Sequence, residues 1–379
     1  MNALRSRAAA AALLCALAAR AAPPADMLPT VLATIRQAAL FDETAPDEPA
    51  WRATLLRAYL AANDPHADLL DAEEMRRLRQ LQTGSAGGVG MTLRRTAPGH
   101  VACLPDEDGA ARRAGVRPLD EVLAVDGVTV AGRSPLAIAA RIAGPVGAPV
   151  TLDLRAPGAA PRRVRVIRSA VDAAGVTAQR LDGRLVVRIA AFAPATRDAV
   201  RRVLRERADG REPIVLDLRG NGGGDFHAAL DTAMLFVPQG RPLATLATRA
   251  GRRDYTASVA PLFARQPLVL WQDGDTASAA EVFIGALTGN ARAASLGTTT
   301  YGKATRQTFF PLPDGSALLL TDARVLPPGG ASFEGRGLRP TRALELPAPA
   351  TRDYLAATSA WLAAQPAPTE ARWPTHPDN

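Results

Sequence analysis

Buried strands alternate with helices through the second half of this chain, and this pattern limits the folds that the chain can adopt. Three apolar runs, at 184–192, 213–220 and 267–272, have the composition of buried strands. Segments with helical spacing lie at 196–208, 226–236 and 277–287. Strands that alternate with helices of about 10–15 residues pack as a largely parallel sheet covered by helices. The sequence therefore predicts an α/β domain over residues 171–350.

Other patterns flank this domain. Helical spacing at 27–40, 48–62 and 71–82 predicts a helical segment over residues 23–86. From "TGSAGGVGM" (83–91) onward the composition changes to short β-like runs, and two of them, 150–155 and 162–167, flank a hairpin turn at 158–162. We predict a β-rich domain over 87–170. Residues 351–379 are predicted to form an amphipathic helix, at 353–365, and a Pro-rich tail.

The first 22 residues have the features of a secretory signal peptide. Arg5 and Arg7 precede an apolar run of about a dozen residues, and Ala19 and Ala21 form a small-x-small cleavage site. The run is too short for a stable membrane span, which needs about 20 apolar residues. We therefore expect a mature protein that begins near Ala22 and is periplasmic or secreted in a bacterial cell.

The two cysteines bear on the same question. Cys15 would be lipidated if the leader were a lipoprotein signal, but the bulky Leu14 before it disfavours that alternative. Once the leader is removed, Cys103 is the only cysteine, so no intrachain disulfide is possible. The domains must then be held together by their cores.

Composition argues against several classes of partner. The formal net charge is +8, yet the arginines are scattered and only 4% of residues are aromatic. A nucleic-acid-binding protein would instead show a basic stripe or aromatic side chains for stacking. His, Cys and Asp do not cluster with the spacing of metal ligands, so we expect neither a catalytic metal nor another cofactor.

Lys303 is the only lysine among the 45 basic residues, and it lies in the short stretch "TYGKATRQ". Arginine carries a positive charge equally well, but only lysine readily loses its proton when it is buried. The lysine is therefore a candidate base.

Ser278, 25 residues before Lys303, follows the strand at 267–272 and begins a helix, where Glu281 completes the spacing of a capping box. Ser278 is consequently either a helix cap, a nucleophile, or both.

A glycine-rich loop, "RGNGGGD" (219–225), follows the strand at 213–220. Such a loop presents several backbone N–H groups to an anion. It lacks the Gly-Lys-Ser/Thr of a P-loop and the spacing of a dinucleotide fingerprint. A serine, a lysine and a set of N–H donors are the groups that an acyl-transfer enzyme requires.

Together these stretches resemble the C-terminal processing peptidases, also called tail-specific proteases, which are periplasmic and plastid serine peptidases with a Ser–Lys dyad. The resemblance covers nearly the whole mature chain. It rests on the order and spacing of "NDPHADLLDAEEMRRLR", "GVGMTL", "DEVLAVDGVTVAG", "DLRGNGGG", "DTASAAEVFIGAL", "TYGKATRQ", "DGSALLLTDARVLPPGG" and "GRGLRP". It implies an α/β peptidase core of the crotonase/ClpP type, an N-terminal helical segment, and an inserted β-rich PDZ domain at 87–170.

The resemblance also implies roles for individual residues. Ser278 corresponds to the nucleophile, Lys303 to the general base, and Gln307 to a glutamine that orients the lysine. The backbone donors of the oxyanion hole correspond to Gly224, Gly223 and Ala279. The chain departs from the family pattern at Ala304, Ala280 and Leu119, where the family often has Gly, Ser and Gly, and none of these changes removes a catalytic group.

The PDZ part implies how a substrate is recognised. The loop Gly88, Val89, Gly90 and Met91 would offer its N–H groups to a free carboxyl terminus, and the adjacent strand edge would pair with an extended peptide. The expected partners are therefore protein or peptide substrates with free C-termini. A regulatory adaptor protein is a further partner that the resemblance allows.

Three alternatives remain at this point. The first is an inactive PDZ adaptor of the same fold. The second is a Ser–His arrangement with His227, which lies just beyond the glycine-rich loop and could be oriented by Asp225 or Asp217. The third is a crotonase-type acyl-CoA enzyme, which a PDZ domain and an export signal disfavour. A penicillin-recognising Ser-x-x-Lys enzyme is excluded, because the only lysine is not three residues after a serine.

Overall fold

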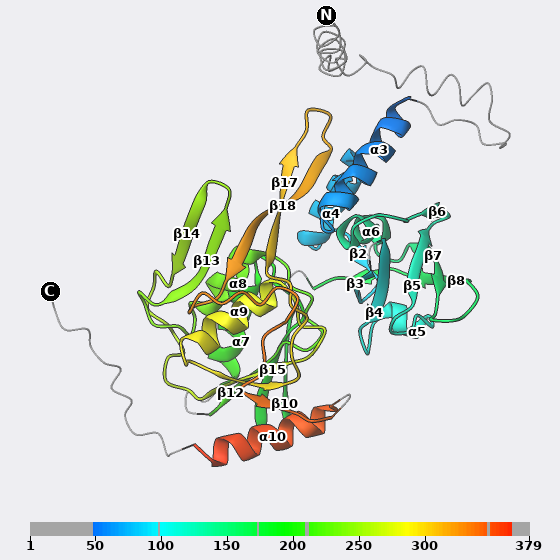
Figure 1. Ribbon diagram of the computed structural model, residues 1–379. Helices are drawn as coiled ribbons and strands as arrows, with labels where there is room; N and C mark the ends of the chain where they lie inside the picture. Colours follow the sequence, from blue (N-terminus) through cyan, green and yellow to red (C-terminus); the bar gives the residue numbers. More distant parts are fainter. Residues whose placement is uncertain (1–47, 98, 173, 209–211, 347–348, 366–379) are drawn as a thin grey trace, which may run out of the picture. The chain divides into compact units, whose positions relative to one another are not determined.

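A six-stranded sheet lies at the centre of the α/β part, in the order β10-β11-β12-β15-β16-β19 (Figure 1). The computed structural model describes residues 48–97, 99–172, 174–208, 212–346 and 349–365. The strands are β10 (Val176–Leu181), β11 (Arg184–Ile189), β12 (Ile214–Asp217), β15 (Leu268–Gln272), β16 (Ala294–Gly297) and β19 (Arg342–Ala343). All neighbours from β11 to β19 are parallel, and only β10 is antiparallel to its neighbour. The predicted, largely parallel sheet is confirmed.

Both faces of this sheet are buried, which explains the continuous apolar runs in the sequence. Leu216 and Leu270 belong to the core that includes residues of α7 (Thr196–Arg207), α8 (Phe226–Ala233) and α9 (Ala279–Gly289). Val215 and Val269 point to the opposite face, which α10 (Thr351–Ala363) covers. The three central helices agree with the expected segments, except that α8 ends at Ala233 and α9 is displaced by two residues.

A second, antiparallel sheet was not predicted. It has the order β1-β18-β13-β14, and β17 also pairs with β18. Its strands are β1 (Asp68–Leu70), β13 (Pro242–Thr248), β14 (Gly251–Thr256), β17 (Thr305–Pro311) and β18 (Ala317–Leu326). Strand β17 begins two residues after Lys303, and β1 comes from the region that precedes the PDZ domain. This sheet therefore connects distant parts of the chain to the segment that carries the lysine.

The PDZ part has its own sheet, in the order β3-β4-β5-β7-β8, with β6 paired to β5. Its elements are β3 (Met91–Ala97), β4 (His100–Pro105), α5 (Ala110–Arg113), β5 (Glu121–Val125), β6 (Val128–Thr129), α6 (Pro135–Ile142), β7 (Pro149–Arg155) and β8 (Arg162–Ile167). The pairing of β7 with β8 confirms the expected hairpin. Strands β2 (Gly87–Gly88) and β9 (Ser169–Ala170) pair where the chain enters and leaves this domain. Strand β3 lies at the edge of the sheet.

In the described part of the chain, the helices that precede the PDZ domain are α3 (Glu48–Asn63) and α4 (Ala72–Gln82), and they match the expected segments at 48–62 and 71–82. Asp71 caps α4, and Glu74 completes a capping box with it. The expected leader at 1–22, the helix at 27–40 and the tail after 365 lie outside the described residues. Within the described residues, every helix is too short or too polar to span a bilayer.

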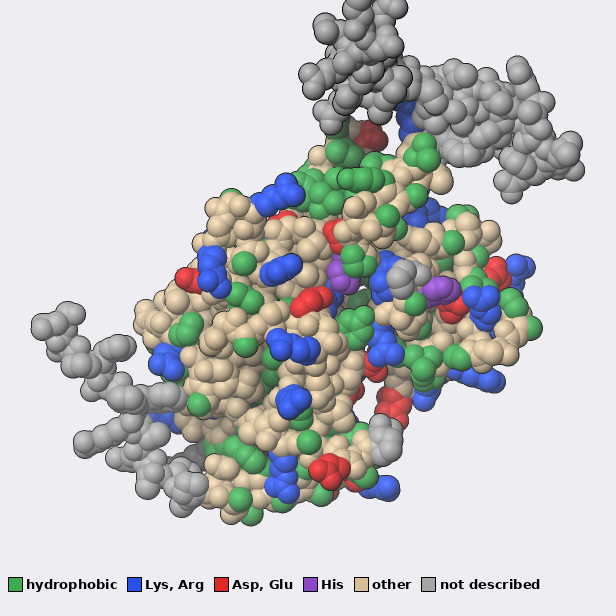
Figure 2. All heavy atoms as spheres, viewed as in Figure 1, with side chains coloured by type: hydrophobic (Ala, Val, Ile, Leu, Met, Phe, Trp, Pro, Cys, Tyr) green, Lys and Arg blue, Asp and Glu red, His purple; other side chains and the backbone are tan. Residues whose placement is uncertain are grey.

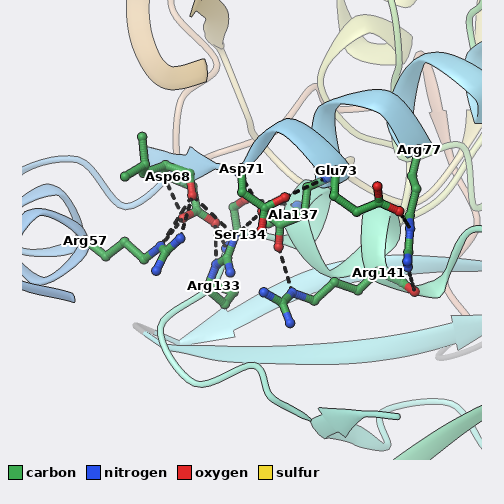
Figure 3. A network of polar contacts seen from close by, with 11 residues as sticks. Arg57, Asp68, Asp71, Glu73, Arg77, Arg133, Ser134, Ala137 and Arg141 are labelled. Atoms are coloured by element: carbon green, nitrogen blue, oxygen red, sulfur yellow. Dashed lines mark hydrogen bonds and ion pairs between the residues drawn. The ribbon is translucent and has the colours of Figure 1, made fainter. Parts of the chain in front are cut away.

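Buried charges connect α4 and β1 to the PDZ domain (Figure 3). Arg133, which lies just before α6, contacts Asp68 at 3.2 Å and Glu74 at 2.8 Å. Arg141 of α6 contacts the other oxygen of Glu74 at 2.7 Å, and Arg57 lies 3.8 Å from Asp68. The side chain of Arg133 is only 7% exposed, and both carboxylates are buried as well. Water therefore cannot readily replace Arg133 as their hydrogen-bond partner.

We expect Arg133→Ala to lower the free energy of unfolding by about 3–5 kcal/mol, because it leaves two buried carboxylates without their shared cation. Arg163→Ala is the matched control, since Arg163 is also paired with an aspartate but is 71% exposed. The control should change stability by less than about 1 kcal/mol. Chemical denaturation of both variants measures the difference, and equal stabilities would contradict a structural role for the buried network.

Candidate active site

Three loops that follow neighbouring parallel strands form the candidate active site. Residues 218–225 follow β12, residues 273–278 follow β15, and residues 298–304 follow β16. Because the carboxyl ends of parallel strands lie at one edge of a sheet, these loops meet there. The glycine-rich loop, Ser278 and Lys303 are consequently brought together, as the resemblance implied.

Ser278 has an unusual backbone conformation at the start of α9. Its φ of 58° and ψ of −122° lie in a region that residues with a side chain rarely adopt. An ordinary N-cap residue has an extended backbone instead, so capping alone does not require this geometry. Strained backbone of this kind is concentrated at functional sites. The conformation therefore favours a role for Ser278 beyond that of a helix cap.

Glu281 joins the serine loop to the lysine loop. Its Oε2 accepts a hydrogen bond from the backbone N–H of Ser278 and another from that of Lys303, both at 2.8 Å. Its Oε1 accepts from the N–H of Gly302 at 2.7 Å and from the hydroxyl of Thr300 at 2.5 Å. Burial raises the pKa of this fully buried carboxyl, while these hydrogen bonds oppose the shift. The sequence indicated only the contact with Ser278, through the capping box, and not the contacts with the lysine loop.

The glycine-rich loop packs directly against Ser278. A Cβ atom on Gly223 would lie 2.8 Å from the Cβ of Ser278, and one on Gly224 would lie 2.1 Å from the carbonyl oxygen of Phe192. Both glycines also have positive φ, so no other residue fits these positions without strain. Buried Asn221 fixes the loop, because its carbonyl oxygen accepts from the N–H of Ala277 at 2.9 Å.

The backbone N–H groups that are free to bind an oxyanion differ in part from the set that the resemblance implied. The N–H of Gly223 donates to Oδ1 of Asn221 at 2.8 Å, so it is not available to an oxyanion in this structure. Within the described residues, the N–H groups of Gly224 and Ala279 have no hydrogen-bond acceptor. Gly224 and Ala279 therefore remain the candidate oxyanion donors, and Gly223 instead allows the close approach to Ser278.

Lys303 is partly buried, and this burial lowers the pKa of its amine to about 8. The nearby carboxylates of Glu334, Glu281 and Asp64 act in the opposite direction. Its Nζ donates a hydrogen bond to Oε1 of Gln307, as the resemblance implied. Within the described residues, no hydrogen bond joins this Nζ to the hydroxyl of Ser278. A substantial fraction of Lys303 is thus neutral near pH 8, which free lysine is not.

Within the described residues, no hydrogen bond connects His227 to Ser278. Its side chain is exposed and packs edge-on against Phe226 and Tyr255. The acids that were expected to orient it have other partners. Asp225 accepts from the N–H of Ala228 at the start of α8, and Asp217 pairs with Arg219.

His66 is a histidine near the site that the sequence did not indicate. Burial, and next the positive charge of Lys303, lower its pKa to about 4. Its own N–H donates to Asp64, which also lies near the lysine. The segment after α3 therefore reaches the active site, and its separation from Lys303 along the chain explains why no local pattern revealed this.

The PDZ loop at 88–91 has the features of an anion-binding turn. The carbonyl groups of Val89 and Gly90 accept from Ala111 and Asp106, at 2.7 and 3.1 Å. The N–H groups of Val89 and Gly90 have no acceptor in the described part of the chain. Leu119, where the family often has glycine, has a φ of 67°, so this position does require a left-handed backbone.

The edge strand of the PDZ domain also touches the catalytic loops. Tyr301 Oη, two residues before the lysine, donates to the carbonyl oxygen of Arg95 at 3.1 Å. Arg94 forms an ion pair with Asp275, three residues before the serine.

The residues that the structure describes contain no group of three His, Cys, Asp or Glu side chains that could hold a metal ion.

Comparisons with known proteins agree with this geometry. Residues 184–344 match peptidase family S41, and residues 101–156 match the PDZ domain family. The chain is 28% identical to the carboxy-terminal-processing protease of Bartonella bacilliformis, over 81% of this chain and 72% of that protein. It is 30% identical to the carboxyl-terminal-processing protease of Synechocystis sp., over 78% of this chain and 71% of that protein.

A solved structure shows the same fold. The photosystem II D1 C-terminal processing protease matches with a TM-score of 0.66 and 31% identity, over 82% of this chain and 86% of that one. The site and the comparisons therefore define a serine-type peptidase with a mixed α/β core and a PDZ domain. The chain belongs to the carboxyl-terminal-processing proteases of peptidase family S41.

Proposed function

We propose that this protein is an exported endopeptidase that recognises protein C-termini through its PDZ domain and cleaves peptide bonds with a Ser278–Lys303 dyad. The observation that carries the catalytic part is the Glu281 clamp, in which one carboxylate oxygen binds the backbone N–H of both dyad residues. The proposal is further supported by the strained backbone of Ser278 and by the burial that lowers the pKa of Lys303 to about 8. A serine and a partly neutral amine are the groups that base-assisted acyl transfer needs.

The proposed reaction has two halves. Neutral Lys303 accepts the hydroxyl proton of Ser278 while Oγ attacks the peptide carbonyl, and the negative charge on the carbonyl oxygen is stabilised by the N–H groups of Gly224 and Ala279. Lys303 then gives the proton to the departing amine as the C–N bond breaks. Water hydrolyses the resulting ester by the same route, with Lys303 again as base. The start of α9 adds the positive end of its dipole near the oxyanion.

Substrate recognition is proposed to begin at the PDZ loop. The N–H groups of Val89 and Gly90, which have no acceptor among the described residues, suit a terminal carboxylate, and edge strand β3 suits pairing with an extended peptide. The named relatives process carboxyl termini, which agrees with this mode of recognition. Nucleic acid is not a proposed partner, because on the face drawn in Figure 2 the Lys and Arg side chains are scattered and do not merge into one patch.

Dyad substitutions test the catalytic proposal. Lys303→Arg, Lys303→Ala and Ser278→Ala should each lower kcat for peptide hydrolysis by roughly a thousandfold or more, because arginine keeps the charge but cannot act as the base. The Ser278→Ala, Lys303→Ala double variant should lose little beyond either single variant, since the two residues act as one unit. In the unmodified enzyme, kcat/KM should rise with pH through about 8, as Lys303 becomes neutral.

His227→Ala is the matched control for these variants and should keep most of the activity, because His227 is exposed and packs against the rings of Phe226 and Tyr255. An active Lys303→Arg enzyme would contradict the proposed base. Full activity in Ser278→Ala would contradict the nucleophile, and absence of peptide hydrolysis by the unmodified protein would instead favour the inactive adaptor.

Peptide binding tests the PDZ proposal. We expect peptides that end in small apolar residues to bind the Ser278→Ala protein, and C-terminal amidation to weaken that binding at least tenfold, because it removes the charged carboxylate. Calorimetry with matched acid and amide peptides gives the comparison. Equal affinities would show that the loop at 88–91 serves only as a turn.

Export rests on the leader pattern in residues 1–22, which lie outside the described structure. We expect protein isolated from the periplasmic fraction or the medium to begin near Ala22, since signal peptidase cleaves after the small residue at Ala21. N-terminal sequencing tests this expectation. Recovery of the chain with Met1 intact, or with a lipid on Cys15, would contradict it.

A further inference from the structure

We propose that Asp64 and Thr321 are positioning residues that fix the orientation of the Gln307 side-chain amide, and through it the orientation of Lys303. This inference rests on the proposed Ser–Lys mechanism, because it concerns how the lysine is presented to Ser278. Both residues lie in stretches that carry the family resemblance, but the resemblance assigns neither of them a role. They are connected to the lysine only in the folded chain.

A continuous series of hydrogen bonds joins the four residues. Nζ of Lys303 donates to Oε1 of Gln307, and Nε2 of Gln307 donates to Oγ1 of Thr321 at 3.0 Å. The hydroxyl of Thr321 donates to Oδ1 of Asp64 at 3.0 Å. The second oxygen of Asp64 accepts from the backbone N–H of Thr321 at 2.8 Å, so both ends of the carboxylate are held by one residue. Nε2 of Gln307 also lies 3.2 Å from Oγ1 of Thr305.

The donor and acceptor capacities of these groups determine the direction of every bond. An ionised carboxylate only accepts hydrogen bonds, so the single hydroxyl proton of Thr321 must point to Asp64. The oxygen of Thr321 is then left as an acceptor, which requires the NH₂ group of Gln307 to face it. The carbonyl oxygen of Gln307 must consequently face Lys303. A flipped amide would instead direct N–H donors at the amine, which has no acceptor when it is protonated.

The protein holds Asp64 in place for this task. Asp64 follows α3 directly, and its N–H donates to the carbonyl of Leu60 at 2.8 Å. Its Oδ1 also accepts from the N–H of His66 at 2.9 Å. Four residues later β1 pairs with β18, with Asp68 opposite Leu319, and β18 carries Thr321. The ladder between β1 and β18 therefore keeps the carboxylate and the hydroxyl in register.

The charge of Asp64 gives the inference a second, independent signature. The ionisable groups that face Lys303 are Glu281 of α9, Glu334 from the loop after β18, Asp64, and His66, which is neutral at pH 7. Each of the three carboxylates favours the protonated amine. Removal of the Asp64 charge should therefore lower the pKa of Lys303 further. Thr321 carries no charge, so its removal should leave that pKa nearly unchanged.

Thr321→Val and Thr321→Ser test the hydrogen-bond series. Valine has the shape of threonine without the hydroxyl, and kcat for peptide hydrolysis should fall roughly 5- to 30-fold, because the amide of Gln307 loses the acceptor that orients it. Serine restores the hydroxyl and should restore most of kcat. Thr308→Val is the matched control, since Thr308 lies in β17 and donates to Asp322 in a similar pair that does not reach the lysine. The control should leave kcat within about twofold.

Asp64→Asn tests the charge. Asparagine keeps the shape, but its NH₂ group can donate to Thr321 and allow the series to reverse. We expect kcat to fall, and the rise of kcat/KM with pH to move to lower pH. A purely structural role of Asp64 would lower the melting temperature without moving the pH profile.

Two outcomes would overturn the inference: wild-type kcat in Thr321→Val, or an unshifted pH profile in a folded Asp64→Asn enzyme. Equal losses in Thr321→Val and Thr321→Ser would also overturn it, because the hydroxyl would then be irrelevant. Ser278→Ala, measured alongside, distinguishes a failure of this inference from a failure of the proposed dyad. Its loss of activity supports the proposed dyad whatever the other variants show, and its full activity would remove the dyad and this inference together.

Discussion

The buried carboxylate of Glu281 is the interaction on which the active site depends. It receives hydrogen bonds from Ser278, Thr300, Gly302 and Lys303, which lie in two loops. An unpaired buried carboxylate would cost several kcal/mol or take up a proton. Here the four donors offset that cost. The same hydrogen bonds fix the separation of the serine and lysine backbones. The charge also lies close to Lys303, where it limits how far burial lowers the lysine pKa.

The parallel sheet supplies the framework for this arrangement. Strands β12, β15 and β16 are neighbours, and each one delivers one component of the site at its carboxyl end. The glycine loop can approach the serine loop only because Gly223 has no Cβ atom, and Asn221 then binds both loops. Strain at Ser278 is thus maintained by contacts on several sides. Local sequence preference alone would not maintain it.

Much of the fold and the centre of the site could be predicted from the sequence, because those features leave local patterns. Apolar runs indicated the central strands, and the spacing of motifs indicated Ser278, Lys303 and Gln307. Features that depend on long-range contacts were missed. The antiparallel sheet needs β1 beside β18, about 250 residues away. The second role of Glu281, the occupied N–H of Gly223, and the Asp64–Thr321 pair also arise only from tertiary packing.

The ionisation state of Lys303 is the central claim of this account, and the composition of the chain offers a direct test. Because Lys303 is the only lysine, protein grown with ¹³Cε- and ¹⁵Nζ-labelled lysine gives one side-chain NMR signal without further assignment. The account predicts that this signal titrates near pH 8 in the folded enzyme and near the ordinary lysine value of about 10.4 after denaturation. Titration of the folded enzyme near 10.4 would contradict a lysine that acts as the base near neutral pH.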